Sequence, residues 1–471
     1  MADQVYERQF KKMTETPVWK LVVQLAVPST ISVLITNIYN LADTYFVSGI
    51  GVYESGATGI VYSLMAIIQA IGYMFGSGAG SCISRLLGAG RKEEARRICA
   101  TIFYVGIAFG AVFSVFGILF IEPFMVLLGS TPLILPSASA YGFYILIAVP
   151  AMVGSFILNN IFRYEGKAIY GMLGLTSGGV LNIFLDYYLI RKAGMGIAGA
   201  GIATCVSQYI ALGVLVGTFA LKKSQVSVHF RYFTPDIRMI VRTTFIGIPS
   251  LVRQGLFGLS AATLNHCAAM VGNEHAIAAM SIVSRVMNLF YCLAIGIGQG
   301  YQPVAGYNYG AGKYDRVKKA MVFMMTFTFI VLAAVVTFGF INASGIISMF
   351  RSDPEIISLG TAAMRAQCIA MPFLAFQICA NMSYQSMGFA IQASVLASFR
   401  SGLFFIPVVI IGTSLFAADG LIYAEAVSDL IGTAASIPFI VSMLKRLNGG
   451  LFYADLRHGG PGRPDKNDPS V

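Results

Sequence analysis

Two carboxylic acids lie inside long apolar segments of the chain, where a charge is costly. Asp43 falls in segment 21–47 and Asp186 in segment 170–190, each about one helical turn from the end of its segment. An ionisable side chain at such a depth costs at least ~2.5 kcal/mol in a membrane and indicates a functional site by default. An isolated carboxylate in a low dielectric takes up a proton or recruits a cation. The two acids therefore predict a site that couples ion binding to another event.

Oxygen-bearing side chains accompany the two acids. Some precede an acid by about one helical turn, on the same helix face, and one stands near the start of the apolar segment 200–221, at a similar depth. These residues are Tyr39, Asn40, Asn182 and Thr204. Their hard oxygen atoms suit a proton relay or a sodium ion, so the site is predicted to bind H+ or Na+. The alternative is that both acids reach headgroups or water and have no coupling role.

The second half of the chain carries a different set of charges inside its apolar segments. Three are arginines, and two are acids four residues apart on one helix face; they are Arg253, Arg285, Arg365, Glu425 and Asp429. Arginine and carboxylate together inside a bundle favour structural ion pairs. The alternative is that an arginine contacts an anionic or amphoteric substrate.

The composition excludes a water-soluble protein. Of 471 residues, 56% are hydrophobic and only 11% are charged, whereas soluble domains carry about 25% charged residues. Twelve apolar segments are each long enough to cross a ~30 Å hydrocarbon core as a helix. They are predicted at 21–47, 57–83, 98–121, 137–162, 170–190, 200–221, 239–265, 276–306, 320–341, 358–386, 396–416 and 421–443. The predicted fold is an all-α polytopic membrane protein.

The net charge of +11 follows the topology of these segments. Most lysines and arginines fall on one side of the membrane, in the N-terminal tail, 85–97, Arg163, Lys167, 222–242, 313–319, Arg400 and 445–466. No lysine or arginine is predicted inside an apolar segment of the first half. Because positive charge concentrates on the cytoplasmic side, both termini are predicted to be cytoplasmic in a cell inner (plasma) membrane protein. The same distribution argues against nucleic-acid binding.

The two halves of the chain repeat one plan. GAGRKEEARR at 88–97 reappears as GAGKYDRVKK at 310–319, and a nearly equal shift places Pro28 on Pro249. An even number of apolar segments per repeat makes the repeats parallel, related by a pseudo-two-fold axis along the membrane normal. The chain is therefore predicted to form two six-helix lobes that rock about a central cleft. A duplicated scaffold without a moving part is the alternative.

The predicted domains follow from this repeat. They are a cytoplasmic tail at 1–20, an N-lobe at 21–221, a cytoplasmic linker at 222–238, a C-lobe at 239–443 and a disordered cytoplasmic tail at 444–471. Pro28 and Pro249 each remove a helical hydrogen bond within a predicted span. They are predicted as hinges, with a static kink as the alternative.

The sequence carries no pattern typical of an enzyme or of an ATP-driven pump. It lacks the G-x-x-x-x-G-K-[ST] loop that cradles a phosphate. Its four histidines have no metal-ligand spacing and its seven cysteines are scattered singly. We expect no enzymatic activity, no cofactor apart from the coupling ion, and neither ATP nor nucleic acid as a partner. A channel or receptor is a rival class, although no repeated filter segment is present.

Four stretches of the chain resemble one known transporter family. They are LAVPSTISVLITNIYNLADTYFVSGIG at 25–51, FRYEGKAIYGM at 162–172, LNIFLDYYLI at 181–190 with GIAGAGIAT at 196–204, and GQGYQPVAGYNYGAGKYDRVKK at 298–319. Together they span nearly the whole chain in the right order. The sequence resembles the multidrug and toxic compound extrusion (MATE) family, within the MOP flippase superfamily.

The resemblance implies a function and a site. MATE proteins are V-shaped pairs of six-helix lobes that export amphiphilic, often cationic, drug-like molecules in exchange for H+ or Na+. The family's N-lobe coupling site and bending proline look like Asp43, Asn182, Asp186, Thr204 and Pro28 here. The resemblance implies a monomer in the lipid bilayer with a small-molecule substrate. The nearest rival is a flippase for a lipid-linked pyrophosphate precursor.

One departure from the family concerns the C-lobe. Some members carry acids in the seventh and tenth spans, where this chain has Arg253 and Arg365 and no carboxylate. The departure argues against an ion site in the C-lobe and against a purely cationic substrate.

Overall fold

The computed structural model describes residues 2–271 and 274–449, and their regular structure is helical throughout. A short helix, α1 (Ala2–Glu15), precedes the first lobe. That lobe consists of α2 (Val18–Ser48), α3 (Val52–Gly88), α4 (Lys92–Leu119), α5 (Ile121–Leu127), α6 (Leu135–Tyr164), α7 (Ala168–Asp186), the π-helical turn η1 (Tyr187–Lys192) and α8 (Gly196–Ala220). The predicted all-α class is confirmed.

The second lobe follows a connection that contains the 3-10 turn η2 (Phe230–Tyr232). It consists of α9 (Ile237–Val271), α10 (Glu274–Gly310), α11 (Tyr314–Ile341), α12 (Ala343–Ser348), α13 (Pro354–Ala370), η3 (Met371–Phe373), α14 (Leu374–Met387), α15 (Ala390–Ser398), the π-helical turn η4 (Phe399–Leu403) and α16 (Phe405–Gly449). The predicted linker 222–238 covers most of the connection, and these domain limits stay a prediction. Residues 450–471 of the predicted C-terminal tail lie outside the described residues.

Within the described ranges, ten helices are long and apolar enough to cross a membrane. Two features reconcile this number with the twelve predicted spans. The last of the ten runs from Ala390 to Asn448 over 59 residues, and it contains a kink at Ala417 (φ 49°, ψ −121°). That kink falls between the predicted spans 396–416 and 421–443. The other feature is α9, which is 35 residues long but is not among the ten.

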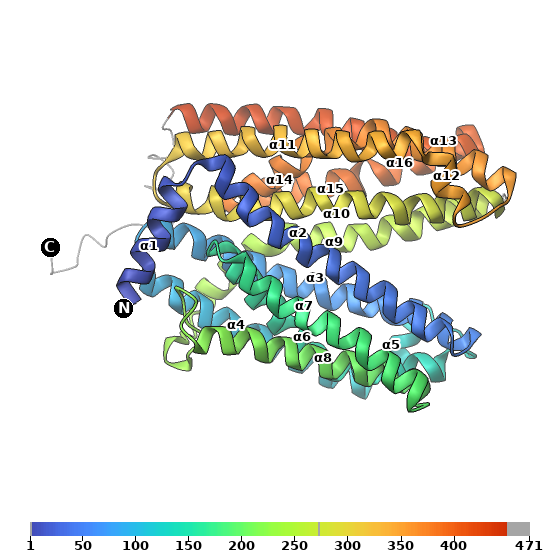
Figure 1. Cartoon of the computed structure of the whole chain (residues 1–471), viewed down its shortest axis with the longest axis horizontal. Helices are drawn as coiled ribbons and strands as arrows, with labels where there is room; N and C mark the ends of the chain where they lie inside the picture. Colours follow the sequence, from blue (N-terminus) through green and yellow to red (C-terminus); the bar gives the residue numbers. More distant parts are fainter. Residues whose placement is uncertain (1, 272–273, 450–471) are drawn as a thin grey trace.

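The helices form two lobes that meet near the end of the molecule where the chain begins. In Figure 1, α4, α6, α7 and α8 lie together on one side, and α10, α11, α14 and α16 lie together on the other. The lobes touch where α2 packs on α10 and α3 packs on α9. These two pairs are equivalent by the internal repeat, because α2 corresponds to α9 and α3 to α10. The contact between the lobes therefore has the pseudo-symmetry of the sequence.

Glycines bring the two lobes into backbone contact. A Cβ atom on Gly247 of α9 would overlap the carbonyl oxygen of Met74 on α3, and one on Gly300 of α10 would overlap the backbone of Ala26 on α2. Small residues are what allow membrane helices to approach this closely. The interface is therefore built for close contact in this conformation.

A buried hydrogen-bond network ties the same interface. The hydroxyls of Ser77 on α3 and Ser250 on α9 lie 2.8 Å apart. Gln385 of α14 donates from Nε2 to both, at 3.2 and 2.8 Å. Ser81 donates to the carbonyl of Gln385 at 2.8 Å. The bonds of Ser77 and Ser81 to Ser250 and Gln385 cross between the lobes, so the lobes cannot separate here without breaking them.

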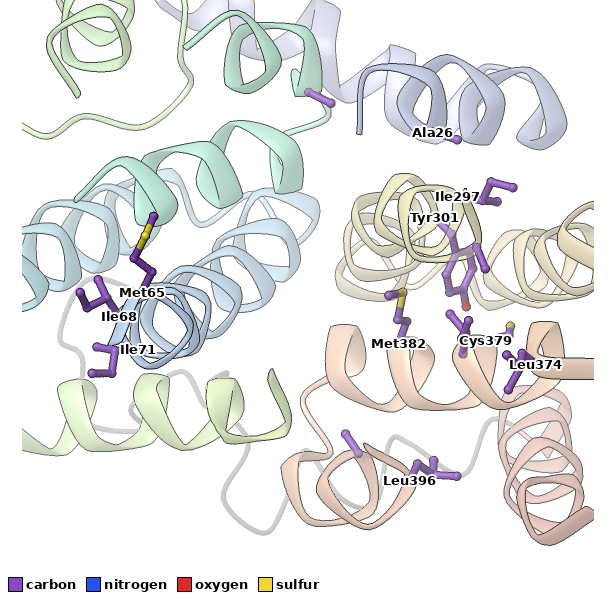
Figure 2. Packing of buried hydrophobic residues seen from close by; sticks show 14 of the residues in the cluster. Ala26, Met65, Ile68, Ile71, Ile297, Tyr301, Leu374, Cys379, Met382 and Leu396 are labelled. Carbon is purple, nitrogen blue, oxygen red and sulfur yellow. The ribbon is translucent and has the colours of Figure 1, made fainter. Parts of the chain in front are cut away.

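The apolar core lies within each lobe. Figure 2 shows Met65, Ile68 and Ile71 of α3 grouped in one lobe, whereas Tyr301 of α10 points toward α14 in the other. The Tyr301 hydroxyl is fully buried and lies 2.8 Å from that of Ser383. A buried hydroxyl needs such a partner, so this bond fixes the register of α10 on α14.

The two predicted hinge prolines lie inside continuous helices, Pro28 in α2 and Pro249 in α9. The carbonyl of Pro28 accepts a hydrogen bond from the Ser32 hydroxyl at 2.9 Å. Pro249 is buried and directly precedes Ser250 of the network between the lobes. Their role as hinges stays a prediction.

The predicted polar tail at 1–20 contains a helix that touches both lobes. Tyr6 of α1 donates to the carbonyl of Leu87 in the N-lobe at 2.8 Å. Asn308 of the C-lobe donates to the carbonyl of Met13 at 3.0 Å, and Met13 is fully buried. The helix α1 therefore packs across the end of the molecule where the lobes meet (Figure 1).

Candidate ion-coupling site

The first predicted acid is buried and has one hydrogen-bond donor. Asp43 lies on α2 and is 7% exposed. Its Oδ2 accepts a 2.5 Å bond from the hydroxyl of Tyr141 on α6. Its Oδ1 is buried and has no hydrogen-bond partner among the described residues. The hydrogen bond therefore holds Oδ2 in place, whereas Oδ1 remains available to accept a hydrogen bond or bind a cation.

The second predicted acid has no hydrogen bond to either oxygen among the described residues. Asp186 ends α7 and is fully buried, as are both of its carboxylate oxygens. The π-helical turn η1 begins at the next residue. Such turns are rare and are often found at functional sites. Asp186 therefore occupies a position where the helix geometry changes and the carboxylate is left free to bind.

The structure brings two more predicted residues together beside Asp186. Asn182 is one turn earlier on α7, and its Nδ2 donates to the hydroxyl of Thr204 on α8 at 3.1 Å. Both side chains are buried, and the Oδ1 of Asn182 has no partner among the described residues. The amide thus presents a second unused oxygen.

Asp43 and Asp186 are near neighbours although they come from different helices. α2 packs against α7, and the two carboxylates are close enough for like-charge repulsion. Tyr141 lies near both acids. Two buried carboxylates on neighbouring helices that repel each other are not readily ionised together unless a positive charge compensates them, because a nearby like charge disfavours the ionised form. The geometry therefore favours binding of a proton or a metal cation.

The remaining two predicted residues differ in their positions. Tyr39 is buried on α2 and lines a small cavity with Asn182, Gln208 and Phe156. Asn40 is half-buried, and among the described residues no hydrogen bond joins its side chain to this cluster. The structure therefore places Tyr39 at the site and gives no such contact for Asn40.

The donor set suits a proton or a small hard cation. The unused atoms are carboxylate and amide oxygens from Asp43, Asn182 and Asp186, which are the ligands that hard cations prefer. Within the described ranges, no three His, Cys, Asp or Glu side chains form a metal-binding group. A cation here would therefore depend on Asn182 and Thr204 as well as on the acids.

The acids of the second half bind an arginine other than the three predicted. Arg400, in the π-helical turn η4, is 3.4 Å from Glu425 and 3.3 Å from Asp429 on α16. Gln367 donates to Glu425 at 2.9 Å, and the guanidinium lies 3.8 Å from the ring centroid of Tyr291. This is a satisfied ion-pair network within the C-lobe.

The three predicted arginines lie apart from this network. Arg253 of α9 is half-buried and donates to Oδ1 of Asn381 at 3.2 Å. Arg285 is exposed on α10. Arg365 is exposed on α13, where its guanidinium lies 5.3 Å from the ring centroid of Phe340. Of the three, only Arg253 is partly buried.

Two arginines need correction. Arg163 and Arg400 are predicted from the sequence as charges of the cytoplasmic face, whereas in the structure Arg163 is buried and Arg400 is half-buried and paired with two acids. Arg163 lies in the last turn of α6 and is 4% exposed, so an arginine does occur inside a first-half span. The hydropathy pattern does not reveal these positions, because each residue stands at the end of an apolar segment, where an arginine normally reaches the membrane surface.

Comparison with known protein families identifies this architecture. The model of the MatE family matches residues 28–188 and 249–411. The two matched regions begin at Pro28 and Pro249, the positions that the internal repeat aligns. They cover most of both lobes.

Curated proteins and solved structures agree with this match. The chain is 27% identical over 448 residues to "Multidrug export protein MepA" of Staphylococcus aureus (strain MSSA476), covering 94% of this chain and 97% of that protein. It is 25% identical over 442 residues to the MepA protein of Staphylococcus saprophyticus subsp. saprophyticus, with the same coverage. Among solved structures, "Crystal structure of MATE in complex with MaL6" matches with a TM-score of 0.87 at 22% identity, over 93% of this chain and 98% of that one. "Outward-facing conformation of a multidrug resistance MATE family transporter of the MOP superfamily" matches with a TM-score of 0.86 at 23% identity, over 93% and 97%.

Proposed function

The chain belongs to the MatE family, and we propose that it is a secondary active antiporter that exports amphiphilic small molecules from the cytoplasm. The exchanged ion is H+ or Na+, and the two lobes provide alternating access. The curated relatives named as multidrug export proteins support this substrate class. They do not favour a flippase for a lipid-linked precursor. The protein works as a monomer in the cell inner membrane, with both termini in the cytoplasm and without ATP.

One observation carries the coupling role. Asp43 and Asp186 are buried on the adjacent helices α2 and α7 of the N-lobe, and neither forms an ion pair with a described residue. Burying two uncompensated charges is prohibitively costly, so the site exchanges protons or cations as its surroundings change. Ion occupancy is thereby linked to the packing of α2 against α7.

The contact between the lobes supplies the second conformational element. In this structure the lobes touch through Gly247, Gly300 and the Ser77–Ser250–Gln385 network. Opening toward the end that carries the termini must break these contacts. An ion drives transport only if it binds one of the two conformations more tightly. We infer that ion binding at the acids changes the course of α2, which carries both Asp43 and the contact with α10.

The proposal is tested in proteoliposomes that contain the purified full-length protein and a fluorescent cationic dye. A pH gradient and a sodium gradient are imposed separately, and dye movement is recorded. We expect saturable dye movement driven by one or both gradients. Dye flux that does not change with either gradient would contradict the proposal that the protein is an antiporter.

A further inference from the structure

A buried arginine of the N-lobe has no anionic partner. Arg163 of α6 is 4% exposed, and its Nη2 donates to Oδ1 of Asn160. Its Nε and Nη1 atoms are buried and have no hydrogen-bond partner among the described residues. No described carboxylate forms an ion pair with it. An arginine stays charged in proteins, so this guanidinium holds two unused donors in a low dielectric.

The acid nearest to Arg163 along the chain forms hydrogen bonds with other residues. Glu165 is fully buried, and its carboxylate accepts bonds from the hydroxyl of Ser224 at 2.5 Å and from the backbone N–H groups of Gln225 and Val226 at 3.0 and 3.3 Å. These partners belong to the connection between the lobes. Glu165 therefore does not neutralise Arg163.

A second arginine approaches from the other lobe. Arg253 of α9 donates to Oδ1 of Asn381 on α14 at 3.2 Å. Its helix and the helix of Arg163, α6, both pack on α3, the helix that carries Tyr73. Both charges act on the phenol of Tyr73 on α3. Tyr73 and Arg253 are half-buried, so this group is not sealed inside one lobe. Two like charges in a shared low-dielectric space repel each other unless an anion lies between them.

The same group adjoins the cavity beside the acids. The ring of Phe156 lies 5.1 Å from that of Tyr73, and Phe156 also lines the cavity that contains Tyr39 and Asn182. Phe156 therefore connects the arginine group with the part of the cavity wall formed by Tyr39 and Asn182, which belong to the site of the acids.

We propose that Arg163 and Arg253 form a binding site for an anionic group of the transported molecule, with Tyr73 beside it. The group is a carboxylate, a sulfonate or a phosphate, because planar guanidinium donors match these oxygen geometries. The preferred substrates are then amphoteric, with a cationic or apolar part directed toward the N-lobe cavity. This inference rests on the proposed export function and specifies its substrate class.

The test uses two dyes that differ only at the anionic group. Rhodamine B carries a free carboxylate, and its methyl ester keeps the cation and loses the carboxylate. Binding of each dye to the purified full-length protein is measured by fluorescence anisotropy for the wild type and for Arg163→Gln, Arg253→Gln and Arg253→Lys. The matched control is Arg285→Gln, which removes an exposed arginine of the C-lobe.

The expected result is a selective loss. Arg253→Gln weakens binding of the acid roughly tenfold or more, the effect of losing one charge-assisted contact of about 1.4 kcal/mol, and leaves the ester within about twofold. Arg253→Lys retains part of the acid affinity, and the control changes neither dye. Equal weakening of both dyes, or unchanged acid binding in both glutamine variants, would overturn the site. If Arg163→Gln does not fold, the result for Arg253→Gln alone decides whether the anion site exists.

A second readout separates this site from the proposed function. Gradient-driven export of the methyl ester in proteoliposomes depends on the antiporter mechanism and not on the arginines. Ester export without selective acid binding would refute the anion site and leave the antiporter intact. Selective acid binding without gradient-driven export of either dye would support the site and refute the antiporter.

Discussion

Tyr141 on α6 donates a 2.5 Å hydrogen bond to Asp43 on α2, across 98 residues of sequence. Both side chains are buried. This bond fixes one carboxylate oxygen and leaves the other without a described partner. Binding or release of an ion at Asp43 can therefore change the packing of α6 directly, as well as that of α2 and α7.

Replacing Tyr141 by phenylalanine tests this relationship. The Tyr141→Phe variant keeps the ring and removes the donor, so Asp43 loses its fixed orientation. A hydrogen bond to a charged group contributes about 1.5–3 kcal/mol, and we expect gradient-driven efflux to fall roughly tenfold or more. Efflux is measured in proteoliposomes, and Tyr144→Phe on the same helix is the control. Equal efflux by the two variants would show that the bond has no coupling role.

Removing either acid tests the coupling site itself. Asp43→Asn and Asp186→Asn keep the side-chain shape but cannot exchange a proton, and they bind a cation poorly. We expect both variants to fold and bind dye, and to lose gradient-driven efflux. The control is Asp315→Asn, which alters an exposed acid in the first turn of α11. Wild-type efflux by either variant would remove that acid from the mechanism.

Glu165 lies outside the spans, in the turn after α6, and gives a pH prediction. Burial raises its pKa above the ordinary value of 4.5, and Lys167 and the Ser224 hydroxyl oppose part of that shift. An acid with a raised pKa in the folded state binds protons more tightly there than in the unfolded chain. Its contribution to stability is therefore largest at low pH and is lost as pH rises through and above 4.5.

The Glu165→Gln variant cannot titrate and isolates this effect. We expect the melting temperature of the wild type, relative to the variant, to decrease as pH rises above about 4.5 and to level off once the carboxyl is ionised in the folded state. The measurement is thermal unfolding in detergent from about pH 4.5 to about pH 8. A relative melting temperature that increases with pH would mean that the bonds to residues 224–226 outweigh burial of the charge.

The Arg400 network gives a stability prediction for the C-lobe. Arg400→Gln leaves the buried Asp429 and the half-buried Glu425 without their cation. Breaking a buried pair costs roughly 3–5 kcal/mol, and partial exposure of these side chains brings the expected loss toward the lower end. Adding Asp429→Asn to Arg400→Gln is expected to restore part of the loss, which a double-mutant cycle measures. If Arg400→Gln is as stable as the control variant Arg285→Gln, the Arg400 ion pairs do not stabilise the C-lobe.

Much of the architecture could be predicted because burial in lipid leaves a strong pattern in the sequence. Long apolar segments define the spans, and the repeated turns at 88–97 and 310–319 reveal the two lobes. Asp43 and Asp186 were identifiable because an acid in such a segment is rare. The position of Asn182 one helical turn before Asp186 indicates it as a partner of that acid, and the similar depth of Thr204 indicates the threonine.

Other features depend on contacts that a linear pattern does not contain. From the sequence alone Tyr141 is indistinguishable from a packing residue, and only the packing of the folded helices places its hydroxyl next to Asp43 of α2. Arg163 and Arg400 stand at the ends of apolar segments, where an arginine normally reaches the surface, and only helix packing shows that Arg163 is buried and that Arg400 pairs with Glu425 and Asp429. The helix α1 has a polar sequence, and its contacts with both lobes arise only in the folded chain.

The glycine contact between the lobes gives a conformational prediction with a control on the same helix. A Cβ atom on Gly247 would overlap the carbonyl oxygen of Met74, whereas no atom lies within 4 Å of a Cβ built on Gly255. Both residues belong to α9, so helix propensity changes equally in Gly247→Ala and Gly255→Ala. Overpacking costs typically 1–3 kcal/mol. We expect Gly247→Ala to shift the population away from the conformation in which α3 and α9 touch.

The shift is measured at Ser250, which is buried beside Gly247 and lies 2.8 Å from Ser77 across the interface. In a cysteine-free background, Ser250→Cys is exposed to a membrane-impermeant thiol reagent. We expect slow labelling alone and with Gly255→Ala, and labelling at least about fivefold faster with Gly247→Ala, as a 1 kcal/mol shift would give. Because the closed contact is one of the two end states, gradient-driven efflux should fall only in the Gly247 variant. Slow labelling and full efflux in Gly247→Ala would mean that α3 and α9 do not separate during transport.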